Sequence, residues 1–375
     1  MNVIFTCGGT GGHINPALAV ANIWKEKHPD SNILFVGGIG GMEEQLVPKA
    51  GYELIALEAH GVRRGKNLRS MAENVWVVFT TWQSYRKCKK IIKDFKPDVI
   101  VGTGGYASFP MLTAGAAMGI PTCVHEANAM PGLTTRMVAE KADRVLVCFP
   151  QSVEHYKNPE KVEVVGMPVR REFVYTKKED ARKELGIEEG VPLVVSAFGS
   201  QGAKAMNEAV GELFRLEQDA GCPFRHIHAI GSYGVEWMPD YVKSKGVDLE
   251  KNPRITMQEY IYNMPTVMAA ADVFISRAGA STCNEIAVSG TPCILIPSPN
   301  VTDNHQEKNA RALSDKDGAV LILEKDCTAQ KLMDEITGIL NNKERSSAMR
   351  KALLEMSVPD CAERLCAIME SLIRK

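Results

Sequence analysis

The chain has 375 residues, a formal net charge of −1, 45% hydrophobic residues and 24% charged residues. This length suits two domains, the composition is ordinary for a soluble globular protein, and the balanced charge does not indicate a nucleic-acid partner. No apolar run approaches the ~18 residues that indicate a membrane-spanning helix, and the N-terminus lacks the pattern of a signal peptide, which argues against secretion.

Short apolar runs alternate with helix-period segments along the whole chain. In the first half, strands are predicted at residues 3–7, 32–36, 53–57, 98–102, 122–125 and 144–148, and helices at residues 16–27 and 74–93. In the second half, strands are predicted at residues 193–197, 226–230, 254–257, 273–276, 293–296 and 319–322, and helices at residues 203–218 and 329–341. This alternation predicts an α/β fold with parallel sheets covered by helices on both faces. The segment 162–170 is the most natural boundary between the halves.

Ten cysteines are scattered along these segments without a CxxC pair or a zinc-like spacing. Cys361 and Cys366 are the closest pair, on a predicted C-terminal helix. We expect the cysteines to act as small apolar side chains, with no disulfide and no metal site.

The first predicted strand runs into the loop GGTGGH at residues 8–13, which precedes a helix expected to begin near Pro16. Glycines let backbone N–H groups approach an anion closely, and a helix N-terminus favours negative charge. The spacing differs from the dinucleotide-binding pattern GxGxxG. A tight turn without a ligand is the alternative, but four glycines and a histidine in six residues favour a binding loop.

Three further glycine loops follow predicted strands, at residues 102–108, 198–203 and 277–282. With two loops in each half, the sequence predicts two Rossmann-like domains that face each other across a cleft and bind an anionic ligand. Glu285 lies on the first turn of the helix after the fourth loop. It is either a capping carboxylate or an acceptor for the two hydroxyls of a ribose, and its spacing does not separate these interpretations.

Seven ordered blocks resemble the MurG family of glycosyltransferase family 28, the UDP-N-acetylglucosamine (UDP-GlcNAc) transferases of peptidoglycan synthesis. The blocks are GGTGGH (8–13), GTGGY (102–106), HEAN (125–128) with GLT (132–134), VGMPVR (165–170), GSQGA (199–203), RAGASTCNE (277–285) and HQEKNA (305–310). The resemblance implies the GT-B fold and inverting transfer of N-acetylglucosamine to the muramyl 4-hydroxyl of lipid I, which gives lipid II. It implies an acceptor and membrane domain (1–165), a UDP-GlcNAc domain (166–357), and a C-terminal helix (358–375) that packs back on the first domain.

The resemblance also implies which residues bind each substrate. In the second half, UDP-GlcNAc would contact Glu285 at the ribose, the Ile261 backbone at the uracil, Ser200, Ala280, Ser281, Thr282 and Arg170 at the diphosphate, and His305 and Gln306 at the sugar. In the first half, Thr10, Gly11, Gly12 and Asn128 would reach the sugar across the cleft, and Gly104, Gly105 and Tyr106 would hold the acceptor diphosphate. Two residues depart from the family pattern. Phe198 replaces a glycine of many relatives and either narrows the approach to the diphosphate or simply packs, and His305 stands where some relatives carry glutamine.

An inverting transfer needs a base for the acceptor hydroxyl and stabilisation of the charge on the leaving UDP. His13 is the first candidate base, because a histidine titrates near working pH, and the alternative is that it only caps its loop. His125–Glu126 is the rival pair, and from it Glu126 is the second candidate. No Asp-x-Asp pair follows a strand in the second half, so we expect no tightly bound cofactor and no protein-held metal. The sequence leaves open whether a magnesium ion binds loosely.

The segment 61–93 carries nine basic residues and one acidic residue, Glu73. The basic residues are Arg63, Arg64, Lys66, Arg69, Arg86, Lys87, Lys89, Lys90 and Lys93. Val75, Val78, Phe79 and Trp82 recur among them at helical spacing, and such a stripe is usually core. The lipid-linked acceptor implied by the resemblance instead favours a membrane-contact surface of Val75, Phe79, Trp82 and Arg86. The expected location is the cytoplasmic face of the membrane, with anionic lipid and proteins of cell-wall synthesis and division as candidate partners.

Three other functions are weighed against this one. Another GT-B nucleotide-sugar enzyme, such as a glycolipid glycosyltransferase or a UDP-sugar epimerase, is disfavoured by the blocks GTGGY and HEAN. A nicotinamide-dependent dehydrogenase is disfavoured by the glycine spacing and by the lack of an acidic residue at a strand end. A non-catalytic nucleotide-sugar sensor is not separated by any motif.

Overall fold

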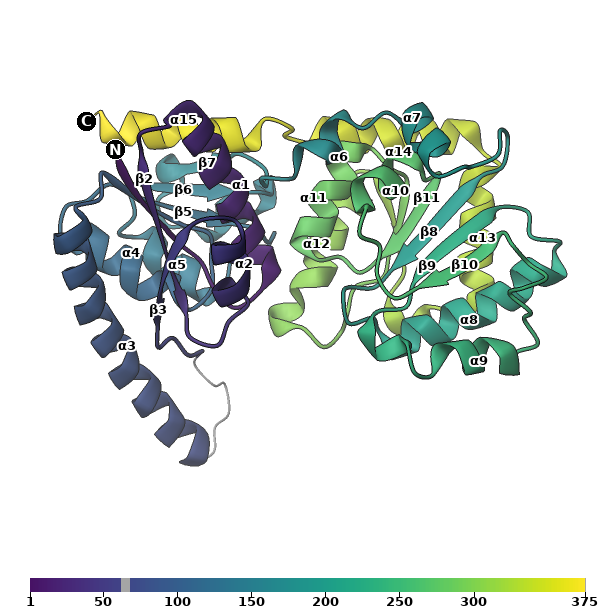
Figure 1. Cartoon of the computed structure of the whole chain (residues 1–375), viewed down its shortest axis with the longest axis horizontal. Helices are drawn as coiled ribbons and strands as arrows, with labels where there is room; N and C mark the ends of the chain where they lie inside the picture. The colour runs from purple at the N-terminus through teal and green to yellow at the C-terminus, as the bar shows by residue number, and fades with distance from the viewer. Residues whose placement is uncertain (62–67, 375) are drawn as a thin grey trace. The chain divides into compact units, whose positions relative to one another are not determined.

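Figure 1 shows the chain as a computed structural model, which describes residues 1–61 and 68–374, with side chains for 1–61 and 74–374. The chain forms two compact units. Unit 1 comprises Met1–Val169 together with Val358–Lys375, and unit 2 comprises Arg170–Ser357. The first unit is therefore built from two separate stretches of the sequence.

The described residues of unit 1 form a seven-stranded parallel sheet in the order β3-β2-β1-β4-β5-β6-β7. Its strands are β1 (Asn2–Thr6), β2 (Asn32–Gly38), β3 (Glu53–Leu57), β4 (Val99–Gly102), β5 (Thr122–Glu126), β6 (Arg144–Val147) and β7 (Val162–Val164). The six strands predicted in this half are confirmed to within two residues at each end. Strand β7 was not predicted, because it is short, lies at the sheet edge and exposes two of its three residues.

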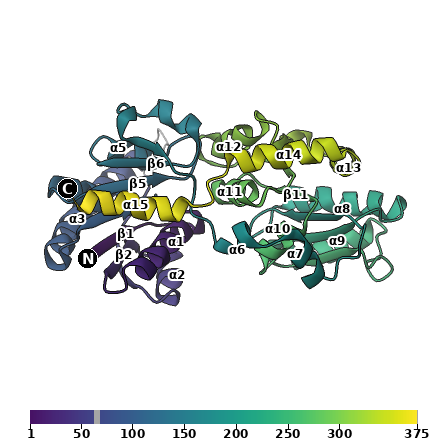
Figure 2. The same ribbon diagram turned by 90° about the horizontal axis from the view of Figure 1, so that it is seen from above.

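Helices cover both faces of this sheet (Figures 1 and 2). On one face, α1 (Gly11–Lys27), α2 (Glu43–Lys49) and α15 (Cys361–Ile373) contribute to a shared apolar core. On the other face, α3 (Leu68–Phe95), α4 (Ser108–Ala117) and α5 (Leu133–Ala139) contribute to a second core. Helix α15 lies alongside α1, and Leu365, Cys366 and Met369 on it are completely buried. Unit 1 is thus completed by residues distant in sequence.

Unit 2 repeats this architecture with six parallel strands among the described residues, in the order β10-β9-β8-β11-β12-β13. The strands are β8 (Leu193–Ala197), β9 (Arg225–Ala229), β10 (Ile255–Gln258), β11 (Val273–Ser276), β12 (Cys293–Leu295) and β13 (Ala319–Leu321), each within one residue of its predicted bounds. The helices are α6 (Arg171–Tyr175), α7 (Lys178–Glu184), α8 (Lys204–Asp219), α9 (Met238–Ser244), α10 (Met264–Ala270), α11 (Ala280–Ser289), α12 (His305–Ser314), α13 (Ala329–Leu340) and α14 (Lys343–Met356). Helices α8, α9 and α13 pack into one core on one face of the sheet. The predicted class, two Rossmann-like parallel-sheet domains, is confirmed.

The cysteines behave as small apolar residues. All ten lie within the described residues, all are free, and nine of them are buried. Burial raises the pKa of the Cys283 thiol to about 12, so it stays protonated at neutral pH. Disulfide chemistry therefore plays no part in this fold.

Candidate active site

The four glycine loops lie where the sheet order reverses. Strands β1 and β4 are neighbours in unit 1, and β8 and β11 are neighbours in unit 2. In each pair the chain continues outward in opposite directions across the sheet, which defines a topological switch point. Ligands of open parallel sheets bind beyond the carboxyl ends of the strands at such points. Each unit therefore places both of its glycine loops at its expected ligand site.

In unit 1 the two glycine loops contact each other through His13. The Nδ1 atom of this ring lies 3.0 Å from the Thr103 carbonyl oxygen, and the Thr103 hydroxyl donates to the His13 carbonyl at 2.6 Å. The first contact requires a proton on Nδ1, so the neutral ring carries its lone pair on Nε2. Gly104 has φ +104°, and a Cβ atom there would lie 2.5 Å from the His13 ring. The close approach thus requires glycine.

Helix α1 begins earlier than the sequence indicates. The helix was expected near Pro16, but it begins at Gly11 and includes Pro16 within it. Two glycines and a proline are poor helix formers, so local propensity hides this first turn. Thr10 occupies the N-cap without a side-chain cap, and no acidic residue lies in the first turn. Gly11, Gly12 and His13 therefore present helix N-terminal backbone at the switch point, which suits an anion.

Glu126 and Asn128 form a separate loop anchor in unit 1. The buried Glu126 carboxylate accepts hydrogen bonds from the Asn128 backbone N–H at 2.9 Å, the Asn128 side chain at 3.2 Å and the Gly132 N–H at 3.0 Å. These donors stabilise a carboxylate and occupy its lone pairs, which suits an anchor better than a base. His125 is buried with its Nε2 2.8 Å from the Gly166 carbonyl oxygen, so it does not face a substrate site.

The loop after β8 in unit 2 is fixed by glycines and by its neighbour. Gly202 has φ +78°, and a Cβ atom there would lie 2.2 Å from the Ile230 carbonyl oxygen. The Ser200 carbonyl accepts from the Ser232 N–H at 3.2 Å. Phe198 is 4% exposed and packs into the core of unit 2 beside His228, with ring centroids 6.0 Å apart. Of the two roles weighed for Phe198, the structure shows packing.

Helix α11 begins within the second glycine loop of unit 2, at residues 277–282. Gly279 is its N-cap without a side-chain cap, so Ala280, Ser281 and Thr282 form a first turn with uncapped backbone N–H groups. The buried Asn309 side chain donates to the Ala278 carbonyl at 3.2 Å and so holds this loop against α12. Two uncapped helices, α8 and α11, thus begin at one switch point. Their N-termini together favour a diphosphate.

Glu285 lies one turn further along α11. Burial raises the pKa of its carboxyl to about 7, and the positive charge of Arg170 opposes this shift. No acidic residue lies in the first turn of α11, so Glu285 does not occupy the position of a capping-box carboxylate. The capping interpretation is therefore wrong, and the role of Glu285 as a hydroxyl acceptor stays a prediction.

The remaining predicted donor residues surround the same edge of unit 2. Ile261 is buried in the segment after β10, between the exposed Tyr260 and Tyr262, whose rings are 5.0 Å apart. The Gln306 side-chain oxygen accepts from the Ser298 N–H at 2.9 Å, and the His305 Nδ1 lies 2.8 Å from the Thr302 carbonyl oxygen. Both side chains are therefore held by the loop that precedes α12.

Two features were missed from the sequence. Glu43 is a fully buried carboxylate whose oxygens accept from the N–H groups of Gly9 and Gly38. Tyr260 and Tyr262 form an exposed aromatic pair beside Ile261. The glycine run at 37–41 followed by Glu43 was the available signal for the first, and the alternation YIY at 260–262 was the signal for the second.

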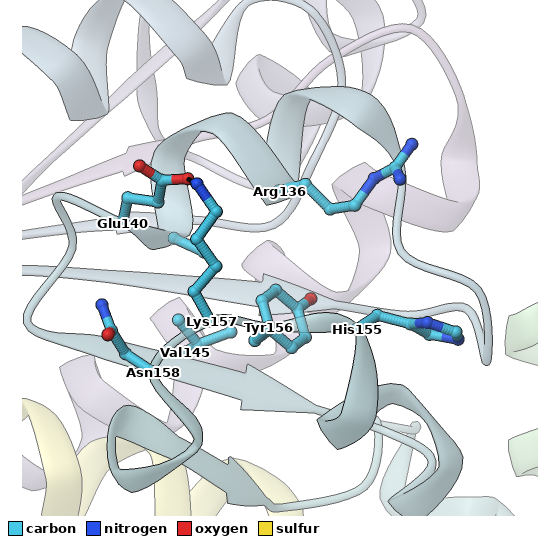
Figure 3. Close-up of a pocket in the computed structure, with 8 residues that line it drawn as sticks. Arg136, Glu140, Val145, His155, Tyr156, Lys157 and Asn158 are labelled. Atoms are coloured by element: carbon cyan, nitrogen blue, oxygen red, sulfur yellow. Dashed lines mark ion pairs between the residues drawn. The ribbon is translucent and has the colours of Figure 1, made fainter.

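Figure 3 shows a small cavity of unit 1 that is separate from the predicted substrate residues. It lies between α5 and the segment 155–158, and Lys157 and Glu140 form an ion pair of 2.6 Å at it. Among the described residues the buried Tyr156 hydroxyl finds no hydrogen-bond partner, and it points toward the side where Arg136 and His155 lie. Its volume of about 240 Å³ falls below the ~300–1,000 Å³ typical of small-molecule sites. This cavity is therefore not the candidate site.

Helix α3 presents an exposed apolar surface. Val75, Val78, Phe79 and Trp82 are 70%, 68%, 52% and 51% exposed, whereas Cys88 and Ile92 on the same helix are buried in the core. The Arg86 guanidinium lies 5.1 Å from the Trp82 ring centroid. The alternative that Phe79 and Trp82 are core residues is wrong. Arg63, Arg64 and Lys66, and the side chains of Arg69 and Glu73, lie outside the described residues.

Two absences hold for the part of the chain that the structure describes. Within residues 1–61 and 68–374, no helix combines the length and the apolar composition needed to cross a membrane. Within the same residues, no three His, Cys, Asp or Glu side chains group as metal ligands.

The fold and the paired glycine loops define an α/β protein of the class with two Rossmann-like domains. Residues 3–147 match the N-terminal domain of glycosyltransferase family 28, and residues 193–365 match the C-terminal domain of that family. The chain belongs to glycosyltransferase family 28, and within it to the MurG family.

Two full-length relatives carry the same description. The protein of Acetivibrio thermocellus is 40% identical over 375 residues, which cover 100% of this chain and 99% of that protein. The protein of Bacillus cytotoxicus is 36% identical over 376 residues, with 100% of both chains covered. Both are described as UDP-N-acetylglucosamine–N-acetylmuramyl-(pentapeptide) pyrophosphoryl-undecaprenol N-acetylglucosamine transferases.

Solved structures share the fold. MurG of Acinetobacter baumannii is similar with a TM-score of 0.78 and 24% identity, and the match covers 99% of each chain. The UDP-GlcNAc 2-epimerase of Neisseria meningitidis bound to UDP-GlcNAc has a TM-score of 0.67 and 14% identity, with 100% of each chain covered. At these identities the structures establish the fold alone, so the family assignment rests on the sequence relatives.

Proposed function

We propose that this chain transfers N-acetylglucosamine from UDP-GlcNAc to the muramyl 4-hydroxyl of lipid I, giving lipid II with inversion at the anomeric carbon. The observation that carries this proposal is full-length identity of 36–40% to relatives with this described activity. The uncapped helix N-termini at both switch points support it, because both substrates contain a diphosphate.

Unit 2 would bind the donor. The N-termini of α8 and α11, with Ser200, Ala280, Ser281 and Thr282, suit the diphosphate, and Arg170 would add a positive charge. Glu285 would accept from the ribose hydroxyls, and the Ile261 backbone would read the uracil. The side chains of His305 and Gln306 would read the sugar hydroxyls.

Unit 1 would bind the acceptor. Gly104, Gly105 and Tyr106 lie on the loop that packs against residues 8–13, and Tyr106 is 58% exposed, so it is accessible to a ligand. We assign the acceptor diphosphate to this loop. Thr10, Gly11, Gly12 and Asn128 are assigned to the transferred sugar.

His13 would act as the general base. Its Nδ1–H donates to the Thr103 carbonyl, so the tautomer that accepts a proton at Nε2 is the one held in place. Glu126 is the second candidate, but its oxygens already accept three hydrogen bonds. The geometry therefore favours His13.

Charge on the leaving UDP would be stabilised by backbone N–H groups and Arg170. Neutral and cationic donors directed at developing charge can replace a metal in this role. We propose that the protein holds no metal or other cofactor tightly, and that any magnesium is carried loosely by the diphosphate.

The apolar surface of α3 would attach the enzyme to anionic lipid at the cytoplasmic face of the membrane. Exposed Phe79 and Trp82 beside Arg86 fit the interface of a bilayer, where aromatic rings and basic groups are both favoured. Proteins of cell-wall synthesis and division would be further partners there.

Steady-state turnover with UDP-GlcNAc and a short-chain lipid I analogue tests the proposal. The expected products are UDP and a disaccharide-linked lipid, with no reaction when the lipid is omitted. Epimerised UDP-sugar without acceptor would identify an epimerase, and donor binding without turnover would identify a sensor. Fluorescence enhancement of NADH would instead identify a dehydrogenase.

A further inference from the structure

Glu43 is a buried acidic residue that contacts the first glycine loop of unit 1. Its side chain is 0% exposed. One oxygen, Oε1, accepts from the Gly38 N–H at 2.7 Å, and the other, Oε2, accepts from the Gly9 N–H at 3.1 Å. The carboxylate thus joins the end of β2 to the loop at 8–13.

Glycines enclose this carboxylate on several sides. A Cβ atom at Gly8 would lie 2.8 Å from Oε1, one at Gly37 would lie 2.6 Å from Cγ, and one at Gly41 would lie 2.2 Å from Oε2. Any side chain at these positions would displace Glu43. Several glycines near the first loop therefore make room for the carboxylate rather than for a substrate.

Burial of a carboxylate is costly unless hydrogen bonds compensate for lost water. Within the described residues Glu43 makes no ion pair, and backbone N–H groups supply its hydrogen bonds. Its charge also contributes, after burial itself, to a raised pKa of the neighbouring Cys7 thiol. An apolar side chain here would leave the Gly9 and Gly38 N–H groups without this acceptor, so the carboxylate fixes the first loop relative to the end of β2.

We infer that Glu43 is a positioning residue that sets the conformation of the loop at 8–13 for glycosyl transfer, and this inference rests on the proposed function. Gly9 donates its N–H to Glu43, so that group does not face a substrate. This hydrogen bond fixes the backbone at Gly9, and it thereby fixes the positions of the Gly11 and Gly12 N–H groups and of the His13 ring. Glu43 would act on the reaction only through this loop.

Glu43→Gln tests the inference with nearly unchanged side-chain volume. The amide replaces one acceptor oxygen by an NH₂ group, which would face a backbone donor. We expect kcat/KM for the lipid I analogue to fall about 10- to 100-fold, because small misplacements of reacting groups carry such losses. The KM for UDP-GlcNAc should rise by a smaller factor, since unit 2 would bind the UDP and only the sugar of the donor would meet this loop. The exposed neighbour Glu44 provides the matched control, Glu44→Gln.

Hydrogen exchange of peptides that cover residues 7–14 supplies a readout independent of turnover. Faster exchange confined to these peptides and to those around Gly38 is expected in Glu43→Gln. If the wild-type chain fails to make lipid II, the proposed function fails, and exchange still decides whether Glu43 fixes the loop. Acceptor kinetics and exchange equal to those of Glu44→Gln would overturn the inference, as would equal losses for both substrates.

Gly41→Ala is the second variant, for use if Glu43→Gln does not fold. Its new methyl group would displace the Glu43 carboxylate, although no residue of the loop at 8–13 is substituted and the net charge stays the same. The same selective loss of acceptor efficiency is expected. Unchanged acceptor kinetics in a folded Gly41→Ala enzyme would also contradict the inference.

Discussion

The carboxyl group of Glu285 links pH to donor binding. Its pKa is raised to about 7 by burial, so the folded chain keeps this proton at pH values where the unfolded chain has lost it. Stability from this group is present at low pH and lost as pH rises toward 7. Ribose hydroxyls need the carboxylate, so affinity for UDP-GlcNAc should rise as pH rises through about 7.

Calorimetry with UDP-GlcNAc between pH 5.5 and 8.5 checks this first prediction, because its diphosphate is a diester that does not titrate in this range. Glu285→Gln should bind more weakly at high pH and lose most of the pH dependence. Glu188→Gln, at an exposed carboxyl of unit 2, is the control. A pH profile of Glu285→Gln identical to the wild-type profile would contradict the assignment.

His13 is tested by a substitution that separates catalysis from loop support. Asparagine places an N–H donor near the position of Nδ1 but offers no basic nitrogen at Nε2. We expect His13→Asn to lower kcat about 10²- to 10⁴-fold, the usual contribution of a general base, with UDP-GlcNAc binding retained. His155→Ala, at the separate cavity of unit 1, is the control. Near-normal turnover of His13→Asn would remove His13 as the base.

The sequence predicted individual residues unevenly. His13 and the glycine loops were evident because they follow strands directly. Glu43 was not, because its partner Gly9 lies far away in the sequence and meets it only after β2 pairs with β1. The packing of Phe198 was equally hidden, because its contact with His228 joins two strands.

Helix α3 carries a prediction at the scale of a single element. Its apolar side chains divide between a buried stripe that includes Cys88 and Ile92 and the exposed surface that includes Phe79 and Trp82. Phe79→Ser with Trp82→Ser should weaken co-sedimentation with anionic vesicles several-fold, because the interface favours aromatic rings. Tyr175→Ser with Tyr233→Ser removes aromatic side chains of unit 2 that are even more exposed, and it should leave binding unchanged. Equal binding of the two double variants would exclude α3 as the membrane contact.

Elements with strong patterns were predicted best. Buried parallel strands such as β4 are continuous apolar runs, and they fell within two residues of expectation. The predicted start of α1 was wrong, because glycine and proline have low helix propensity and the first turn therefore has no signal in the sequence. Strand β7 was missed, because an edge strand that is mostly exposed has no apolar run to detect.

At the scale of the molecule, unit 1 depends on α15. Leu365 is completely buried there against the core that α1 and the sheet share. Leu365→Ala should lower the free energy of unfolding of unit 1 by about 2–5 kcal/mol, the usual range for a buried leucine. Ser371→Ala, on the exposed side of α15, should change it by less than about 0.5 kcal/mol. Chemical denaturation followed by far-UV circular dichroism measures both, and equal midpoints would show that α15 is dispensable.

The discontinuity of unit 1 has a consequence for biosynthesis. Unit 2 is a single uninterrupted stretch, so all of its residues have been synthesised before residues 358–373 are made. Unit 1 begins first, yet part of one apolar face stays uncovered until α15 packs beside α1. The sequence of the second unit is thus complete before that of the first, and a chain that ends near residue 357 would lack α15 and expose the apolar surface that this helix covers.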